Sequence, residues 1–393
     1  MLGGMDNSAT SPQAQIAEFE EIAHSGGQMI FTVATAEDGR RSYQLTWTHS
    51  RPVASAIYAI YALPQGIPVG MIQMGGIGTP WNDPPIPGCY PVLIASDSEG
   101  LFGQQCPACH GYWRCRGGGT TCPYCGTRAE RHNFLTAAQR RYVYQYCRRL
   151  DDALQAEEDG NHVIDMDAVA DAVKKTEKPA FYYAEESQQN KFTCDACGRF
   201  NDILGMYGYC SVCGTRNDLQ EFEAKTIARL RDRINAGGPY EDCVKDAVAA
   251  FDSFVGQYAR QLAQRVPITP ARRARFEKMR FHNLRAVAAE FKAAFDIDVL
   301  EGIKPEDADF AVLMFHRRHV YEHNGGEADE KYIADSGDGS VRPKQALRET
   351  QGSAHRLAGL VVKMAGNLHR GFHEIFQPLA EPIEHHARWP VRE

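Results

Sequence analysis

Eight of the twelve cysteines form four Cys-x-x-Cys pairs, a spacing suited to metal binding. Each pair supplies two thiolates, and two pairs complete the tetrahedral shell of a zinc ion about 2.3 Å from each sulfur. Twelve residues separate the two pairs in both sets, a match that a lone redox motif would not give. The sequence therefore predicts two structural zinc ions, with the ligands Cys106, Cys109, Cys122 and Cys125 in one site and Cys194, Cys197, Cys210 and Cys213 in the other.

A glycine follows the second cysteine in three of the four pairs, at Gly126, Gly198 and Gly214, whereas the fourth pair has His110. Glycine permits the positive φ with which the backbone turns around the metal. Four cysteines close the coordination shell, so each site is expected to stabilise the fold and to perform no chemistry. The remaining cysteines, interpreted as free thiols, are Cys89, Cys115, Cys147 and Cys243.

A second chemical signal lies in the C-terminal third of the chain, in the run FHRRHVYEHNGG. The guanidinium of Arg318 offers a fork of donors matched to phosphate oxygens. Histidine side chains, such as those of His319 and His323, can accept or donate a proton near neutral pH. Together these side chains could hold a phosphate and move protons beside it.

The run resembles the signature of HEPN domains, in which an arginine and a polar residue precede a histidine. Here the residues are Arg318, His319 and, after three further positions, His323. The stretch 325–332 and the amphipathic segment before the run are similar to that superfamily as well, and the resemblance spans about residues 270–376. It implies a helical bundle that forms a homodimer and acts as a metal-independent endoribonuclease, often a toxin in stress or anti-phage defence.

The resemblance implies a role for each of these residues. His323 would be the general acid or base, Arg318 would bind the phosphate, and His319 would orient one of the two. The RNA 2′-hydroxyl would attack the phosphate and give a 2′,3′-cyclic phosphate and a 5′-hydroxyl, with no catalytic cofactor. On an ideal helix Arg318 and His323 point about 140° apart, so a second copy about a two-fold axis is expected to complete the site.

Two other interpretations of the run stay open. His316, His319 and His323 share one helical face and could bind a metal, although they span about 10 Å. Alternatively, Arg318 and His323 could stabilise the helix C-terminus through its dipole, in a bundle without activity. The chain would then be a nonenzymatic adaptor that binds nucleic acid or protein.

Basic side chains elsewhere suggest where RNA would bind. The stretch from position 260 to 300 contains nine basic residues and four acidic residues. Such an excess of positive charge is expected where a protein contacts a phosphate backbone. The alternative is a helix face exposed to solvent. Tyr112, Trp113, Arg114 and Arg116 in the first cysteine set suit base stacking and phosphate contact, with a scaffold role as the alternative. The clustered residues predicted to bind nucleic acid are Arg272, Arg273, Arg275, Lys278 and Arg280.

These side chains need elements to position them, and the chain as a whole is expected to be a multidomain α+β protein. Short strand-like runs bounded by Gly, Pro or Asp predict an N-terminal β barrel or sandwich. Helical periodicity predicts a C-terminal all-α bundle, HEPN-like by the resemblance. The expected parts are a flexible N-terminus at 1–28, the β domain at 29–105, four-cysteine zinc ribbons at 106–130 and 191–218, a helical connector at 131–190 and the helical domain at 219–393.

Several helix boundaries follow from capping patterns. Thr136 is expected to cap a helix that runs to position 156. Asp309 is a candidate cap for the helix that carries the Arg/His run, and Asn324-Gly325-Gly326 is a left-handed stop. The helices expected around these signals cover 166–175, 219–236, 240–264, 270–295, 305–323 and 343–376.

Composition and charge narrow the classes of protein. Of 393 residues, 24% are charged and 43% hydrophobic, which is ordinary for a folded soluble protein. The net charge of −7 means that RNA must meet local basic patches. No apolar run approaches the roughly 20 residues that span a bilayer, and the N-terminus lacks a signal sequence. We therefore expect no membrane partner and a cytoplasmic location, where paired cysteines favour metals over disulfides.

Overall fold

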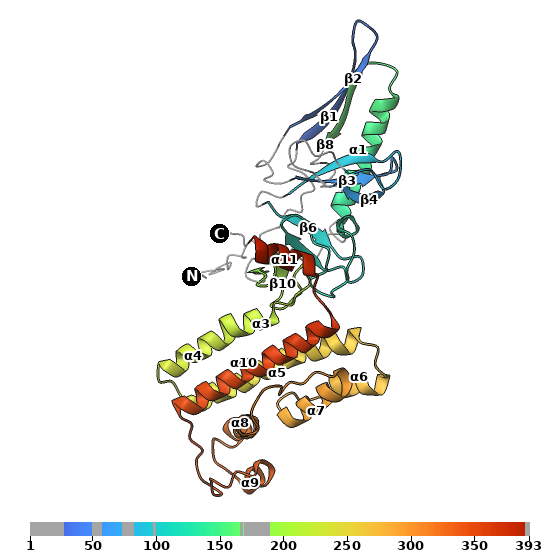
Figure 1. Cartoon of the computed structure of the whole chain (residues 1–393). Helices are drawn as coiled ribbons and strands as arrows, with labels where there is room; N and C mark the ends of the chain where they lie inside the picture. Colours follow the sequence, from blue (N-terminus) through green and yellow to red (C-terminus); the bar gives the residue numbers. More distant parts are fainter. Residues whose placement is uncertain are drawn as a thin grey trace, which may run out of the picture. The chain divides into compact units, whose positions relative to one another are not determined.

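The computed structural model describes residues 27–48, 57–72, 82–96, 100–165, 168 and 189–389. It divides into two compact units, of which unit 1 is Met1–Gly214 together with Leu379–Glu393 and unit 2 is Thr215–Pro378. In the described ranges, unit 1 contains three small antiparallel sheets and unit 2 is helical (Figure 1). The expected mixed α+β class is confirmed.

The first sheet of unit 1 joins strands that are far apart in the sequence. Its order is β2-β1-β8, and all its neighbours are antiparallel. Alternate side chains of the central strand, Met29, Phe31 and Val33, are buried, as the two-residue period of a strand requires. The strands are β1 (Gln28–Thr35), β2 (Arg41–Trp47) and β8 (Gly160–Asp165).

The second sheet has the order β4-β3-β5 and shares a core with the first. The helix α1 (Ala137–Gln155) lies along the first sheet (Figure 1) and contributes Tyr142 and Tyr146 to that core. Thr136 caps it as expected, because its side chain accepts a hydrogen bond from the backbone N–H of Gln139. The strands are β3 (Ile57–Ala62), β4 (Pro68–Ile72) and β5 (Tyr90–Ala95).

The barrel or sandwich expected at 29–105 is not confirmed, and the connector expected to be helical at 131–190 also contributes a strand. In the described ranges β1 to β5 form two open sheets, the first of which is completed by β8 from the connector, and β6 belongs to a third sheet. Met29 of β1 pairs with Ile164 of β8, and both side chains are buried, so β8 adds to the core of this sheet. Except for Ala168, the helix predicted at 166–175 lies outside the described residues.

The third sheet carries the cysteine sets and has the order β6-β7-β10-β9. The short 3-10 helix η1 (Arg131–Phe134) follows the first set. The helix α11 (Ala380–Arg388) also belongs to unit 1, because the Leu379 N–H donates to the Cys213 carbonyl at 2.8 Å and Ile383 packs against the sulfur-rich core. The helical domain predicted to reach position 393 therefore ends earlier. The strands are β6 (Phe102–Gln105), β7 (Tyr112–Cys115), β9 (Gln189–Thr193) and β10 (Phe200–Leu204).

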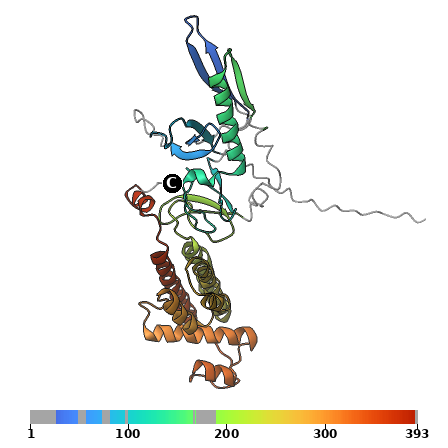
Figure 2. The ribbon, with the colours of Figure 1, turned by 90° about the vertical axis from the view of Figure 1, so that its right-hand side faces the viewer.

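Unit 2 is built around two long helices, α5 and α10, which pack side by side (Figure 1). The helix α8 crosses them, with α9 on its other side (Figure 2). The bounds are α3 (Asp218–Glu221), the π-helix η5 (Phe222–Ile227), α4 (Ala228–Asn235), α5 (Tyr240–Arg265), α6 (Pro270–Glu277), α7 (Leu284–Phe295), α8 (Pro305–His323), α9 (Glu330–Ser336) and α10 (Gln351–Ile375).

The helix at 305–323 and its glycine stop are confirmed, with φ of 59° at Gly325 and 85° at Gly326. Three details differ from the expectation. Lys304, not Asp309, precedes the first turn of α8, and Pro305 begins it. The predicted helix at 270–295 is broken into α6 and α7. The one predicted at 343–376 starts only after Thr350, whose side chain caps α10.

No helix in the described part of the chain is long and apolar enough to cross a membrane.

The assignment of β8 to the core can be tested with two neighbouring side chains. Ile164 is 2% exposed and Val163 is 38% exposed. Ile164→Ala is expected to lower the free energy of unfolding by about 2–5 kcal/mol, because it leaves a cavity. Val163→Ala should change it by less than about 0.5 kcal/mol. Urea denaturation of the full chain measures both, and equal effects would place β8 outside the core.

Candidate functional site

The two cysteine sets have the dimensions of tetrahedral metal sites. In each set the four Sγ atoms lie within 4.8 Å of one another. Thiolates 2.3 Å from a central zinc ion lie about 3.8 Å apart in a regular tetrahedron. The measured Sγ–Sγ distances are close to that value: 3.7 Å for Cys106–Cys125, 3.6 Å for Cys109–Cys122, 3.7 Å for Cys194–Cys213 and 3.6 Å for Cys197–Cys210. Both sets could therefore hold a metal ion such as zinc.

All four Cys-x-x-Cys turns have the same backbone geometry. The residue after each second cysteine has a positive φ, and its N–H donates to the carbonyl of the first cysteine at 2.8 to 2.9 Å. The expectation for the three glycines is confirmed. His110 adopts the same conformation with φ of 59°, at the steric cost of a Cβ atom. The φ values of Gly126, Gly198 and Gly214 are 70°, 66° and 82°.

The four other cysteines are free thiols, as expected. Burial raises the pKa of Cys115 to about 11 and the pKa of Cys147 to about 12. Both thiols therefore stay protonated at neutral pH. Cys243 is also buried and Cys89 is partly buried.

The two cysteine sets are fused by strand pairing into a double ribbon related by a local two-fold axis. Arg114 in β7 pairs with Asp202 in β10, 88 residues later, and the same step leads from Cys106 to Cys194. The contacts are reciprocal: the Thr121 N–H donates to Ser211 O at 2.9 Å, and the Tyr209 N–H donates to Pro123 O at 2.8 Å. Equivalent positions of the two ribbons therefore face each other.

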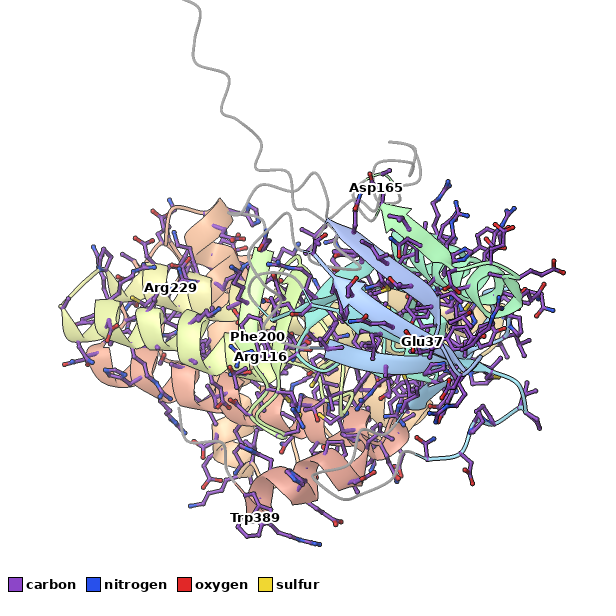
Figure 3. The ribbon with its side chains drawn as sticks, turned by 90° about the horizontal axis from the view of Figure 1, so that it is seen from above. Glu37, Arg116, Asp165, Phe200, Arg229 and Trp389 are labelled. Carbon is purple, nitrogen blue, oxygen red and sulfur yellow. The ribbon has the colours of Figure 1, made fainter. Side chains whose placement is uncertain are left out.

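A buried ion pair lies at this axis. Arg114 and Asp202 are 6% and 0% exposed, and Oδ2 accepts from Nε at 3.0 Å and from Nη2 at 2.6 Å. The neighbouring residues Tyr112 and Trp113 are buried as well. These three residues of β7 are therefore unavailable for base stacking or phosphate contact, and the scaffold interpretation of the first ribbon is favoured. Arg116 is exposed beyond the end of β7, and Figure 3 labels it beside Phe200 of β10.

In unit 2 the adjacent arginines of α8 have different environments. The Arg317 side chain is 13% exposed and donates to two buried carboxylates, Asp338 and Glu349, each at 3.0 Å. Tyr332 donates to Asp338 at 2.6 Å and Tyr321 to Glu349 at 2.6 Å. Arg317 therefore fastens α8 to the segment between α8 and α10.

Arg318 faces a different carboxylate and two histidines. Its Nη2 lies 2.9 Å from Glu322 Oε2, and the same oxygen lies 3.6 Å from His323 Nε2. The rings of His319 and His323 are 4.6 Å apart, and the His323 side chain is 58% exposed. The Nε of Arg318 is buried, and no group in the described part of the chain accepts a hydrogen bond from it. The three predicted catalytic residues therefore lie together.

This arrangement changes the expectation that Arg318 and His323 diverge by about 140°. Their backbone positions diverge, but the long arginine side chain brings the guanidinium to a carboxylate that the imidazole also reaches. One chain thus places both groups beside one anion.

Sequence reasoning missed His282, which lies in the loop between α6 and α7. Its Nδ1 is 3.8 Å from Asp252 Oδ1. Burial lowers the pKa of His282, and the charge of Arg318 lowers it further. Because His282 stands 36 positions before Arg318, no local spacing could have joined it to the run.

A cavity of about 500 Å³ lies between this loop, α8 and α9. His319 lines it together with His316 and His282, so one predicted catalytic residue borders both the cavity and His323. Burial lowers the pKa of His316, which keeps its ring neutral at physiological pH.

All five residues of the predicted basic cluster are exposed, and two of them have partners within the chain. Arg273 Nε donates to the Ala263 carbonyl at 2.9 Å, and Arg275 forms an ion pair with Glu290. Arg272 and Lys278 are exposed, and Arg280 is exposed and lines the cavity.

The alternative of a histidine metal site is not supported in the described ranges. Among the described residues, the two cysteine sets are the groups in which three or more Cys, His, Asp or Glu side chains lie close enough to bind one ion. His316, His319 and His323 do not form such a group.

Comparisons of the chain with protein-family models, with curated proteins and with solved structures found no match.

The ion pair at the two-fold axis yields a stability prediction. Asp202→Ala leaves the buried Arg114 guanidinium without its carboxylate and is expected to cost about 3–5 kcal/mol. Asp152→Ala breaks the pair of Arg149 and Asp152, whose side chains are 45% and 43% exposed, and should cost about 0–1 kcal/mol. Denaturant unfolding compares the two variants, and a cost for Asp202→Ala as small as the control's would show that the axis is not fixed by charge.

Proposed function

We propose that the chain is a metal-independent endoribonuclease of the HEPN type, held together in unit 1 by two structural zinc ions. The reacting groups are His323, His319 and Arg318 on α8. The double ribbon and the β sheets of unit 1 act as regulatory or sensor modules. The resemblance also suggests a role in stress or anti-phage defence.

The observation that carries the proposal is the carboxylate of Glu322. Its Oε2 is held by Arg318 Nη2 at 2.9 Å and lies 3.6 Å from His323 Nε2. A carboxylate oxygen has the charge and hydrogen-bonding geometry of a phosphate oxygen. An RNA phosphate in its place would meet both the cation and the imidazole. The buried Nε of Arg318, which has no partner in the described residues, offers a second donor to the same phosphate.

The reaction uses only proton transfer and charge stabilisation. One histidine removes the proton from the 2′-hydroxyl, whose oxygen attacks phosphorus. The bond from phosphorus to the 5′-oxygen breaks, and a protonated histidine supplies a proton to that oxygen. Arg318 stabilises the charge on the phosphorane. With rings 4.6 Å apart, His319 and His323 could share the two proton transfers, or His319 could orient His323.

A homodimer through unit 2 remains part of the proposal, on the strength of the resemblance. The dimer is not required to bring Arg318 to His323, because one chain brings both to Glu322. A two-fold arrangement would instead duplicate the site or shield it from water.

The zinc ions support the fold of unit 1 and take no part in this chemistry. The Sγ distances of 3.6 to 3.7 Å match a closed tetrahedron of thiolates, which leaves no open position for substrate. The regulatory role of the ribbons therefore rests on their surfaces.

The competing proposal is a nonenzymatic adaptor that binds nucleic acid or protein. The Arg318–Glu322 ion pair is the observation that favours it, since an occupied guanidinium is what a bundle without activity would also have. The two proposals differ in whether RNA is cut.

The wild-type chain is expected to cleave RNA in the presence of EDTA and to leave 2′,3′-cyclic phosphate and 5′-hydroxyl ends. His323→Ala and Arg318→Ala should each lower the rate at least about 100-fold, since each removes a proton-transfer or charge-stabilising group. Mapping of product ends by mass spectrometry measures the outcome. Binding without cleavage, unaffected by either substitution, would favour the adaptor.

Glu322→Gln provides a matched variant at the same place. It keeps the size of the side chain and removes the charge that competes for Arg318, so RNA binding is expected to tighten several-fold. If tighter binding is accompanied by slower cleavage, Glu322 takes part in proton transfer. If binding does not change, the ion pair is not in the path of the phosphate.

Elemental analysis after dialysis against chelator-free buffer is expected to return two zinc ions per chain, because the binding free energy of zinc at closed thiolate sites is roughly 10–16 kcal/mol. Cys194→Ser should lose one ion and destabilise unit 1. Cys147→Ser, at a buried thiol outside both sets, should retain two. Iron, or fewer than two ions in the wild-type chain, would contradict the zinc assignment.

A further inference from the structure

The cavity beside the catalytic group has the size and walls of a binding site for one nucleotide. Its volume of about 500 Å³ falls within the range of small-ligand sites, roughly 300–1,000 Å³. Its apolar floor contains Phe315, Val320 and Leu284, all buried. A purine or pyrimidine ring could lie against such a surface.

Two positively charged side chains line this cavity, and they come from different segments of the chain. Arg280 comes from the loop before α7, and Lys331 comes from α9. Both are exposed, and in the described part of the chain neither forms an ion pair. Side chains placed in this way suit the phosphates on either side of one nucleotide.

The polar side chains inside the cavity suit the edge of a base. His316 can be donor and acceptor at once when its ring is neutral, and burial lowers its pKa accordingly. Asp335 supplies an acceptor nearby, and its charge acts on His316. His319 lines the same cavity, and its ring lies 4.6 Å from the ring of His323, so the cavity opens beside the proposed reacting groups.

We propose that this cavity holds the base and ribose of one unstacked nucleotide adjoining the phosphate at Arg318, which makes single-stranded RNA the substrate. This inference rests on the proposed function for its biological meaning. Recognition of a base splayed out of the stack is the usual way in which proteins read single-stranded RNA. Duplex RNA would be refused, because its bases are paired and stacked.

The test measures the binding of four ribonucleoside 3′-monophosphates and of inorganic phosphate to the full wild-type chain by calorimetry. Mononucleotides offer no phosphodiester to cut, so binding is separated from cleavage. At least one nucleotide is expected to bind ten times more tightly than phosphate. Val312→Trp, which fills the cavity from α8, should abolish that preference, and Arg280→Ala with Lys331→Ala should weaken nucleotide binding at least tenfold.

Arg231→Ala removes an exposed arginine of α4 that does not line the cavity and serves as the matched control. The tryptophan could perturb packing. If Val312→Trp does not fold, the double alanine variant, whose substitutions lie at exposed positions, is the decisive test. Nucleotides that bind no more tightly than phosphate, or that are indifferent to the double variant, overturn the inference.

Cleavage of a hairpin RNA is measured in parallel and separates the two proposals. Cuts confined to the loop support the inference, and cuts within the stem overturn it. If nucleotide binding depends on Arg280 and Lys331 but no RNA is cleaved, the result supports the nucleotide site and contradicts the proposed ribonuclease activity.

Discussion

Unit 2 depends on the mostly buried guanidinium of Arg317, which forms ion pairs with both Asp338 and Glu349. These carboxylates lie at the two ends of the irregular stretch between α9 and α10, so one side chain of α8 fixes that whole stretch. Burial raises the pKa of the Asp338 carboxyl group. Hydrogen bonds from Ser340, Tyr332 and Arg317 lower it by more, so that the pKa is about 2. The stabilising charge is therefore fully present above about pH 4 and is lost as the pH falls toward 2.

The position of Arg317 also decides what Arg318 can do. Neighbouring residues of a helix point about 100° apart. Because Arg317 points toward Asp338 and Glu349, Arg318 points toward Glu322 and His282. That is where Arg318 keeps a buried Nε without a partner in the described residues. From the sequence, two adjacent arginines are equivalent. Only Asp338 and Glu349, which are distant in the sequence, distinguish Arg317, which holds the loop, from Arg318, which is the proposed phosphate-binding residue.

The sequence predicted the features whose causes are local. The cysteine spacing sets the tetrahedral dimensions, the glycines set the turns, and Pro305, Asn324 and Gly325 bound α8. Features whose causes are distant could not be predicted in this way. The connector strand β8 completes the first sheet because Ile164 meets Met29 across it. Tyr112 and Trp113, which were predicted to suit nucleic-acid contact, are buried, and the ring of Trp113 packs edge-on against Phe134, 21 positions later. His282 joins the site through the break between α6 and α7.

The double ribbon and the α8 site each contain an arginine–carboxylate ion pair, and the two pairs differ in the exposure of the carboxylate. At the two-fold axis, Arg114 has a buried carboxylate partner and is sealed from solvent, so its charge serves to hold two metal-binding halves together. On α8, Arg318 has a partner that is 31% exposed and one turn away on the same helix. Such a pair contributes little to stability, so in the proposed nuclease the phosphate of an RNA would displace a single carboxylate. Under that proposal Glu322 holds the anion position of Arg318 in the absence of RNA.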